Sequence, residues 1–251
     1  MGKAGLKPAF FPGINAASAV RFFRLAQKIM EKIKLVIFDL DGTLVDAYPA
    51  ITESFNHVML CLGLPPEPAA VVRGAVGRGD AGLLRPFVPK KSLKKALGIY
   101  RKHHARALRR KARLLPGAAE LMAYLKKKGV PMAVASNRPT RFSRILIDNL
   151  ALDGYFVYVL CADKLKKGKP DPLILRLILS KLGINRADAL YVGDMGIDAL
   201  TGLRAGVRTA IVLTGSGKKE EIKPFSPWKI VRSLGDLRKI LTRRVGCYNI
   251  E

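Results

Sequence analysis

The chain has 251 residues, 49% of them hydrophobic, which is enough to bury a full globular core in one or two domains. No uncharged apolar run approaches the roughly 20 residues that span a bilayer. The three cysteines, Cys61, Cys161 and Cys247, form no CxxC pair, so neither a disulfide framework nor a zinc site is indicated. We therefore expect a reducing, cytoplasmic setting.

The formal net charge is +26, from 45 Lys and Arg against 19 Asp and Glu. Such a charge predicts attraction to polyanions, namely nucleic acid, anionic membranes or phosphorylated small molecules. A generally basic, solvated surface explains the same total, and no RNA-binding signature or basic-aromatic stripe localises the charge. Nucleic acid therefore stays an open but secondary partner.

Residues 1–32 precede the first expected strand and form a basic N-terminal extension. Leu25, Ile29 and Ile33 are spaced four apart among lysines and arginines, so an amphipathic basic helix is predicted over residues 16–34. A helix packed on the domain or a frayed extension is favoured over a membrane-surface helix. Arginines interrupt the apolar stretch, which argues against a secretory signal.

Residues 35–38 are a short apolar run that predicts a buried strand, and Asp39 and Asp41 follow at its end. Side chains two residues apart leave a strand on the same side, and Gly42 allows a tight turn directly afterwards. Paired acids at a strand end are costly to bury without a cation. They therefore indicate a metal site or a catalytic pair.

The periodicity from about residue 48 to residue 115 is helical, and no strand is predicted there. Helices are expected at residues 49–62 and 91–113, with a segment rich in proline and glycine between them. We interpret residues 47–115 as an inserted, all-helical module.

Two segments imitate nucleotide-binding loops. Gly77, Gly79 and Gly82 match GxGxxG, but the preceding segment is a poor buried strand, so we expect the glycines to form a loop whose backbone approaches a ligand. Residues 214–219 resemble part of a P-loop but lack its first glycine and its final Ser or Thr. We expect that stretch to be a connecting loop after a strand.

Strand and helix alternate from residue 116 onward. Strands are expected at residues 131–135, 155–160, 189–193, 208–213 and 229–231, and helices at 118–128, 141–150, 172–182, 198–204 and 235–243. Such alternation predicts an α/β fold with a Rossmann-like parallel sheet covered on both faces. Ligands in these sheets bind at the carboxyl ends of the strands.

Polar side chains follow three of the strands: Asp39 and Asp41, Ser136 and Asn137, and Asp194. If these ends converge, the three carboxylates can hold a hard cation, and Mg²⁺ fits because it typically takes one or two carboxylates together with water and phosphate. The hydroxyl and the amide can donate to phosphoryl oxygens, and Lys169 adds a fixed positive charge. An acid beside the nucleophile can protonate a leaving alkoxide and later activate water. The sequence thus contains all the groups that phosphoryl transfer requires.

Four segments, in this order, resemble the motifs of the haloacid dehalogenase superfamily over residues 33–243. They are DLDGT at residues 39–43, Ser136, Lys169 within GKPDP, and GDMGID at residues 193–198. The resemblance implies an inserted helical cap at residues 47–115 of the C1 type, which closes over the site and selects the substrate. The catalytic core would then be residues 33–46 and 116–251.

The same resemblance implies roles for individual residues. Asp39 would be the nucleophile that forms an aspartyl-phosphate, and Asp41 the general acid and base. Mg²⁺ would be held by the Asp39 carboxylate, the Asp41 backbone carbonyl and Asp194. Asp198 would orient Lys169 or a metal-bound water. The acid at position 41 is typical of phosphatases and phosphomutases, whereas dehalogenases lack it because a halide leaves without a proton.

Three further segments resemble the phosphoglycolate phosphatase-like group: DAYP at residues 46–49, RGAVGRG at 73–79 and SNRP at 136–139. By that resemblance Arg73 and the glycine loop after it face the non-phosphate end of the substrate. The candidate substrate-binding residues are Thr43, Ser136, Asn137 and Arg73.

We therefore expect a Mg²⁺-dependent phosphatase that acts on a small phosphorylated metabolite such as 2-phosphoglycolate. A pyrophosphatase or nucleotidase and a β-phosphoglucomutase-type enzyme are alternatives of the same fold, and polyanion binding is an alternative of another class. The three histidines, His57, His103 and His104, have no role in the expected mechanism.

Overall fold

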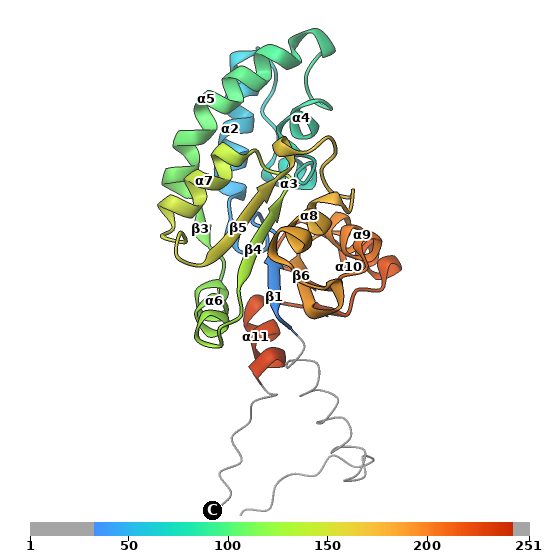
Figure 1. Cartoon of the computed structure of the whole chain (residues 1–251). Helices are drawn as coiled ribbons and strands as arrows, with labels where there is room; N and C mark the ends of the chain where they lie inside the picture. Colours follow the sequence, from blue (N-terminus) through green and yellow to red (C-terminus); the bar gives the residue numbers. More distant parts are fainter. Residues whose placement is uncertain (1–32, 243–251) are drawn as a thin grey trace, which may run out of the picture.

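The computed structural model describes residues 33–242, whose core is a six-stranded sheet in the order β5-β4-β1-β6-β7-β8 (Figure 1). All neighbouring strands run parallel. The strands are β1 (Leu35–Phe38), β4 (Met132–Ser136), β5 (Phe156–Cys161), β6 (Ala189–Gly193), β7 (Arg208–Val212) and β8 (Lys229–Val231). This confirms the predicted α/β fold, and each predicted strand is present within one residue of its expected bounds.

The helix predicted at residues 16–34 lies almost wholly outside the described residues, as does Cys247. Within the described residues, no helix combines the length and the apolar character that crossing a membrane requires.

Helices pack on both faces of the sheet because successive side chains of a strand point to opposite faces. The helices of the core are α6 (Ala118–Lys127), α7 (Thr140–Asn149), α8 (Leu173–Leu182), α9 (Gly196–Ala205) and α11 (Leu234–Thr242). In β1, Val36 and Phe38 pack in one core with buried residues of α6, α7 and α11. Leu35 and Ile37 pack in a second core, chiefly with α8. Both faces of β1 are therefore buried, and this packing fixes the position of its carboxyl end, which Asp39 follows.

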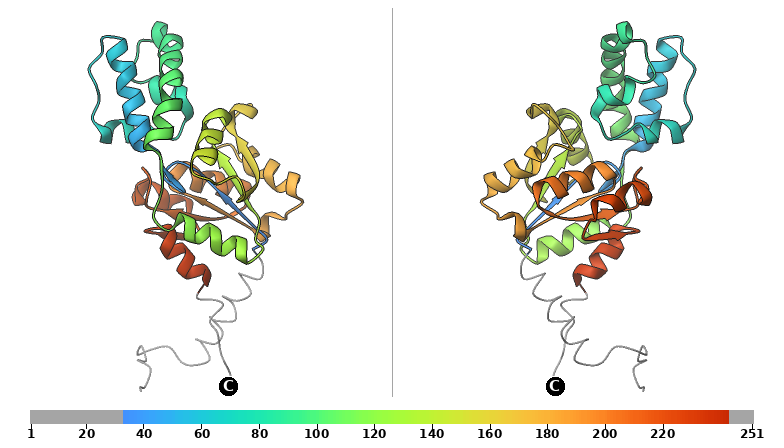
Figure 2. Two further views of the ribbon diagram at one scale, coloured as in Figure 1. Left: turned by 90° about the vertical axis from the view of Figure 1, so that its left-hand side faces the viewer. Right: turned by 90° about the vertical axis from the view of Figure 1, so that its right-hand side faces the viewer.

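The inserted segment folds into helices that stand at the carboxyl end of the sheet, beyond the core (Figure 2). They are α2 (Tyr48–Cys61), α3 (Ala69–Gly74), α4 (Gly79–Leu84), the 3₁₀ helix η1 (Lys90–Ser92) and α5 (Leu93–Lys111). The long helices α2 and α5 pack against each other. The buried side of α5 carries Ala96, Tyr100, His104 and Leu108, which are spaced four residues apart as one helical face requires. We call this group of helices the cap.

Two short strands join the cap to the core, which corrects the prediction that residues 48–115 hold no strand. β2 (Val45–Asp46) pairs antiparallel with β3 (Arg113–Leu114), where the chain leaves the core and returns to it. A pair of two-residue strands has no periodic pattern of its own, so it left no signal in the sequence. The remaining short elements are η2 (Ala162–Lys164), η3 (Arg186–Asp188), α10 (Lys219–Ile222) and η4 (Lys223–Phe225).

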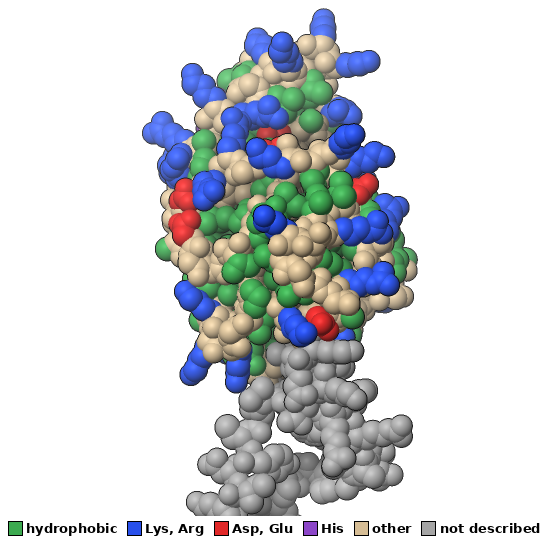
Figure 3. All heavy atoms as spheres, in the orientation of Figure 1, with side chains coloured by type: hydrophobic (Ala, Val, Ile, Leu, Met, Phe, Trp, Pro, Cys, Tyr) green, Lys and Arg blue, Asp and Glu red, His purple; other side chains and the backbone are tan. Residues whose placement is uncertain are grey.

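The basic side chains are spread over the visible face of both cap and core rather than gathered over one element (Figure 3). On this face the distribution is that of a generally basic surface, the simpler of the two interpretations of the net charge.

The same substitution in two helices is expected to have opposite effects on stability. A Cβ on Gly202 of α9 would lie 1.8 Å from Oγ1 of Thr209, which is itself buried, whereas a Cβ on Gly98 of α5 would meet no atom within 4 Å. We expect Gly202→Ala to lower the free energy of unfolding by about 1–3 kcal/mol through overpacking. Gly98→Ala should raise it by up to about 1 kcal/mol through helix propensity. Urea denaturation measures both, and a stabilised Gly202→Ala variant would contradict the packing of α9 on β7.

Candidate active site

The predicted convergence of strand ends is present in the structure. Strands β4, β1 and β6 are neighbours, so Ser136, Asp39 and Asp194 lie at adjacent carboxyl ends. A cavity of about 50 Å³ lies there under the cap. Of the predicted site residues, it is lined by Asp39, Asp41, Ser136, Asn137 and Lys169. From the cap, it is lined by Ile51, Val76, Gly77, Gly79, Asp80, Leu83 and Tyr100.

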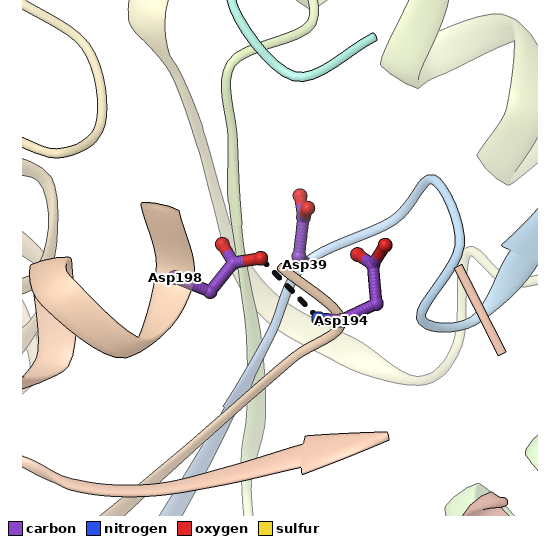
Figure 4. Close-up of side chains that lie close together, drawn as sticks. All are labelled: Asp39, Asp194 and Asp198. Atoms are coloured by element: carbon purple, nitrogen blue, oxygen red, sulfur yellow. Dashed lines mark hydrogen bonds between the residues drawn. The ribbon is translucent and has the colours of Figure 1, made fainter. Parts of the chain in front are cut away.

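Three buried carboxylates lie close together at the strand ends (Figure 4), and of the three Asp39 alone lines the cavity. Ligand oxygens of Asp39, Asp194 and Asp198 all lie within 4.8 Å of one another. Burial raises the pKa of Asp39 to about 6, although Lys169 acts in the opposite direction. Burial, and then the charges of Asp198 and Asp39, raise the pKa of Asp194 well above its usual value. The cluster therefore carries more negative charge than its surroundings stabilise.

This cluster fits a hard divalent cation. Oδ1 of Asp39 is buried and accepts no hydrogen bond from any of the described residues. Buried polar atoms are nearly always satisfied in native proteins, so an open carboxylate oxygen in an acidic cluster points to a cationic ligand.

Lys169 supplies the positive charge of the cluster. Its Nζ lies 3.0 Å from Oδ2 of Asp39 and 2.7 Å from Oδ1 of Asp198, and it donates to the hydroxyl of Tyr191 at 3.2 Å. Burial alone would lower the pKa of Lys169, but the two carboxylates outweigh it and raise that pKa. The ammonium group thus stays charged while it touches the predicted nucleophile.

The oxygens of Asp198 are occupied by groups of the protein. They accept hydrogen bonds from Lys169, from the Tyr191 hydroxyl at 2.6 Å, and from the backbone N–H groups of Asp194 and Met195 at 3.3 and 3.1 Å. Of the two roles that the family resemblance left open, these contacts match the orientation of Lys169. Tyr191, which sequence reasoning missed, shares in this anchoring from the middle of β6.

Asp194 is enclosed by two loops. Oγ1 of Thr43 donates to its Oδ1 at 3.1 Å, and the backbone N–H of Ser216 donates to its Oδ2 at 3.2 Å. A Cβ on Gly215 would lie 1.6 Å from Oδ2 of Asp194, and a Cβ on Gly42, whose φ is +76°, would lie 2.5 Å from it. Glycine is thus required on both sides of this carboxylate. The stretch after β7, expected to be a mere connection, is a wall of the site.

Two of the predicted substrate-binding residues make contacts of a different kind. Thr43 is fully buried and holds Asp194, and it does not line the cavity. The amide Nδ2 of Asn137 donates to the carbonyl oxygens of Gly77 and Lys169 at 2.8 and 3.0 Å, and its Oδ1 accepts from the Lys169 N–H at 2.7 Å. Through these three bonds, Asn137 joins the cap loop that carries Gly77 to the loop that carries Lys169.

Arg73 also connects the cap to the core. Its Nη2 donates to the carbonyl oxygens of Thr214 and Gly215, both at 2.8 Å, and its guanidinium carbon lies 4.2 Å from the ring centroid of Tyr48. Arg73 is not among the residues that line the cavity, and its contact with a substrate stays a prediction. Ser136, by contrast, lines the cavity, and its Oγ accepts only the N–H of Arg138 among the described residues.

A buried arginine meets the second acid of the first motif, and this contact was not predicted. Nε and Nη2 of Arg138 donate to the two oxygens of Asp41 at 2.7 and 2.6 Å, while Nη1 lies 2.8 Å from Nε2 of His104 in the cap. The conspicuous SNRP segment pointed to Arg138 but not to its partner. No spacing in the sequence relates His104 to Asp41.

We expect Asp194→Asn to stabilise the metal-free protein. A raised carboxyl pKa means that the folded state binds the proton more tightly than the unfolded state, so ionised Asp194 costs stability at pH 7. That cost is absent below the ordinary pKa of 3.8 and grows as the pH rises. Urea denaturation in EDTA at pH 7 should give a gain on the order of 1 kcal/mol.

The control for this experiment is Asp188→Asn, which removes one partner of a surface pair with Lys34 at 3.4 Å. We expect it to change the free energy of unfolding by less than about 1 kcal/mol. A loss of stability in Asp194→Asn would contradict an excess of negative charge in the cluster.

Comparison with known proteins agrees with this geometry. Residues 36–212 match the family model described as haloacid dehalogenase-like hydrolase. The chain is 34% identical to phosphoglycolate phosphatase 1 of Pseudomonas aeruginosa over 81% of this chain and 78% of that protein. It is 31% identical to a plasmid-borne phosphoglycolate phosphatase of Cupriavidus necator, over 82% and 92% of the two chains.

A solved structure from Haemophilus somnus, described as a predicted phosphoglycolate phosphatase, is 25% identical and superposes with a TM-score of 0.78. It covers 83% of this chain and 98% of its own. The family model spans most of the described residues and includes the strand ends that carry Asp39, Ser136 and Asp194. The chain therefore belongs to the haloacid dehalogenase-like hydrolase family.

Proposed function

We propose that the chain is a Mg²⁺-dependent phosphatase that hydrolyses a small phosphomonoester through an aspartyl-phosphate, with 2-phosphoglycolate as the first candidate substrate. The observation that carries this proposal is the state of Asp39, whose Oδ2 contacts Lys169 while its buried Oδ1 has no partner among the described residues. The relatives named phosphoglycolate phosphatase support the choice of substrate.

The residues that would hold Mg²⁺ are Asp39, Asp194 and the backbone carbonyl of Asp41. The raised pKa values of the two carboxyl groups indicate that a nearby cation would be favourable for both. When bound, the metal offsets the negative charges of the nucleophile and of the phosphoryl group as they approach each other.

In the first half of the reaction the Asp39 carboxylate attacks phosphorus. An O–P bond forms to Asp39, the bond to the leaving oxygen breaks, and that oxygen keeps the electron pair and takes the proton of Asp41. The Ser136 hydroxyl, which lines the cavity, would donate to a phosphoryl oxygen, and Lys169, whose three N–H groups already meet Asp39, Asp198 and Tyr191, would contribute its positive charge. In the second half the Asp41 carboxylate takes a proton from water, which attacks phosphorus and breaks the bond to Asp39. Inorganic phosphate leaves, and both acids return to their starting state.

The cavity at the strand ends is small. One water needs about 10–15 Å³ of such space, so a cavity of about 50 Å³ holds only a few waters. A wider cavity of about 900 Å³ shares Asn137 and Lys169 with it, so the choice of a small substrate rests on the named relatives. The cap contributes two polar side chains to the lining, Tyr100 and Asp80, and Oδ2 of Asp80 lies 3.1 Å from Nε of Arg101.

The Asp39→Asn variant tests the nucleophile. An amide cannot form the acyl-phosphate, so phosphate release from 2-phosphoglycolate with Mg²⁺ should fall by at least about 10³-fold. Asp153→Asn, the same change at an exposed acid, should leave the rate unchanged. Phosphate release by Asp39→Asn at the wild-type rate, or release that EDTA does not abolish in the wild type, would contradict the proposal.

The charge of Asp80 should weaken the binding of an anionic leaving group. We expect Asp80→Asn to lower KM for 2-phosphoglycolate about 3–10-fold relative to KM for ethyl phosphate, whose organic part is uncharged. Measuring both substrates with one enzyme preparation separates the charge effect from a general change of the cap. An equal change for the two substrates would show that Asp80 does not face the organic part.

A further inference from the structure

A buried chain of hydrogen bonds runs from the cap to Asp41. It passes from Ser54 of α2 to His104 of α5, then to Arg138 after β4, and ends on the Asp41 carboxylate. We propose that His104 is a positioning residue, which fixes the guanidinium of Arg138 and through it the carboxylate that exchanges the proton with the leaving group. The role given to Asp41 rests on the proposed function, whereas the hydrogen-bond chain stands on the geometry alone.

The contact between Arg138 and Asp41 has the fork geometry of a bidentate pair. Nε and Nη2 each meet one carboxylate oxygen, at 2.7 and 2.6 Å, and the side chain of Arg138 is only 6% exposed. Burial opposes the charge of the guanidinium, but Asp41 outweighs it and raises the pKa of Arg138. Two parallel bonds set the plane of the carboxylate, which a single point charge would not do.

The direction of each bond in the chain follows from the chemistry of the groups. A guanidinium has only donors, so Nε2 of His104 must accept from Nη1 of Arg138 at 2.8 Å. Burial, and then the charge of Arg138, lower the pKa of His104 to about 2, so the imidazole is neutral. Its hydrogen therefore sits on Nδ1, which donates to Oγ of Ser54 at 3.0 Å, and Ser54 donates onward to the carbonyl oxygen of Ala50 at 2.8 Å. Because the single hydrogen of Ser54 is used in this way, Nδ1 of His103, 3.1 Å from the same Oγ, is a second donor to it.

Aromatic contacts also fix the orientation of the imidazole ring. Its ring stacks on Tyr100 at a centroid distance of 4.7 Å and meets the edge of Phe142 at 5.0 Å. His104 is fully buried on the apolar side of α5, where an aliphatic side chain would need no polar partner. A histidine held there in one tautomer and one orientation is suited to fix a buried donor group, and Nη1 of Arg138 is that group.

The hydrogen-bond chain begins in the cap, and it therefore links the cover of the cavity to the orientation of Asp41. Ser54 and His104 belong to α2 and α5, while Arg138 and Asp41 belong to the core. The cap also covers the cavity through Ile51, Val76, Leu83 and Tyr100. The part of the molecule that surrounds the organic end of the substrate therefore also orients the group that protonates it.

Leaving-group dependence tests this role. An alkoxide needs the proton of Asp41 as it leaves, whereas weakly basic p-nitrophenolate leaves without one. We would measure kcat/KM for ethyl phosphate and for p-nitrophenyl phosphate, because kcat/KM covers the steps up to the aspartyl-phosphate and excludes its hydrolysis. The ratio of the two values does not depend on the fraction of folded enzyme, so a destabilised variant remains informative.

In His104→Leu the ratio of ethyl to p-nitrophenyl phosphate activity should fall about 10–100-fold, since a misplaced proton donor loses this much. His104→Gln offers an acceptor in place of Nε2 and should stay within about threefold of the wild type on the same scale. His57→Leu is the control for a cap histidine one contact further out, and its ratio should equal that of the wild type: His57 stacks on His103, which meets Ser54 at 3.1 Å, but it touches none of the four residues of the hydrogen-bond chain itself. A wild-type ratio in His104→Leu, or equal losses in the leucine and glutamine variants, would overturn the proposal.

A second measurement does not depend on activity. The ¹⁵N chemical shifts of the His104 ring in the wild-type protein should report a neutral imidazole with its hydrogen on Nδ1 from pH 5 to pH 9. A hydrogen on Nε2, or protonation in this range, would overturn the hydrogen-bond chain. Failure of the wild type to release phosphate from either ester would contradict the proposed function and leave this test intact.

Discussion

The structure depends on an imbalance of buried charge at the carboxyl end of the sheet. Asp39, Asp194 and Asp198 lie together in the core, and the ammonium of Lys169 touches two of the three. Burying carboxylates in this way is strongly unfavourable unless each is met by donors or by a cation. Asp198 has its donors within the protein, whereas Asp39 keeps an oxygen without one. The fold thus leaves uncompensated negative charge at Asp39, the proposed nucleophile.

The two acids of the first motif illustrate how environment separates their roles. Asp39 and Asp41 are two residues apart, yet Asp39 lies among like charges that add to its burial, and Asp41 lies against the guanidinium of Arg138. Asp39 keeps one oxygen without a partner among the described residues, as an attacking group requires, whereas two parallel hydrogen bonds hold the carboxylate of Asp41 in one plane. The different surroundings of the two acids come from tertiary contacts, because both acids lie in the same short turn of the sequence.

The strand ends were predictable and the cap contacts were not, for a physical reason. In a parallel sheet all strands end at one edge, so locating the strands puts Asp39, Ser136 and Asp194 at that edge, and the order β4-β1-β6 makes them neighbours. The bond between Arg138 and Asp41 joins residues 97 positions apart, and the one between Arg73 and Thr214 joins residues 141 apart. These contacts depend on how the cap sits on the core, which no periodicity encodes. The two-residue strands β2 and β3, at the base of the cap, were not predicted for the same reason.

The cap therefore acts on the site from two sides. Arg73 and Asn137 connect it to the loops around Asp194 and Lys169, and His104 connects it to Arg138. Each connection ends on a backbone or a side chain next to Asp194, Lys169 or Asp41. A change in the seating of the cap would consequently move the proposed metal ligand and the proposed proton donor together. Because a displacement of about 1 Å in such groups can cost about 10²-fold in rate, the seating of the cap would affect the proposed catalysis by the core.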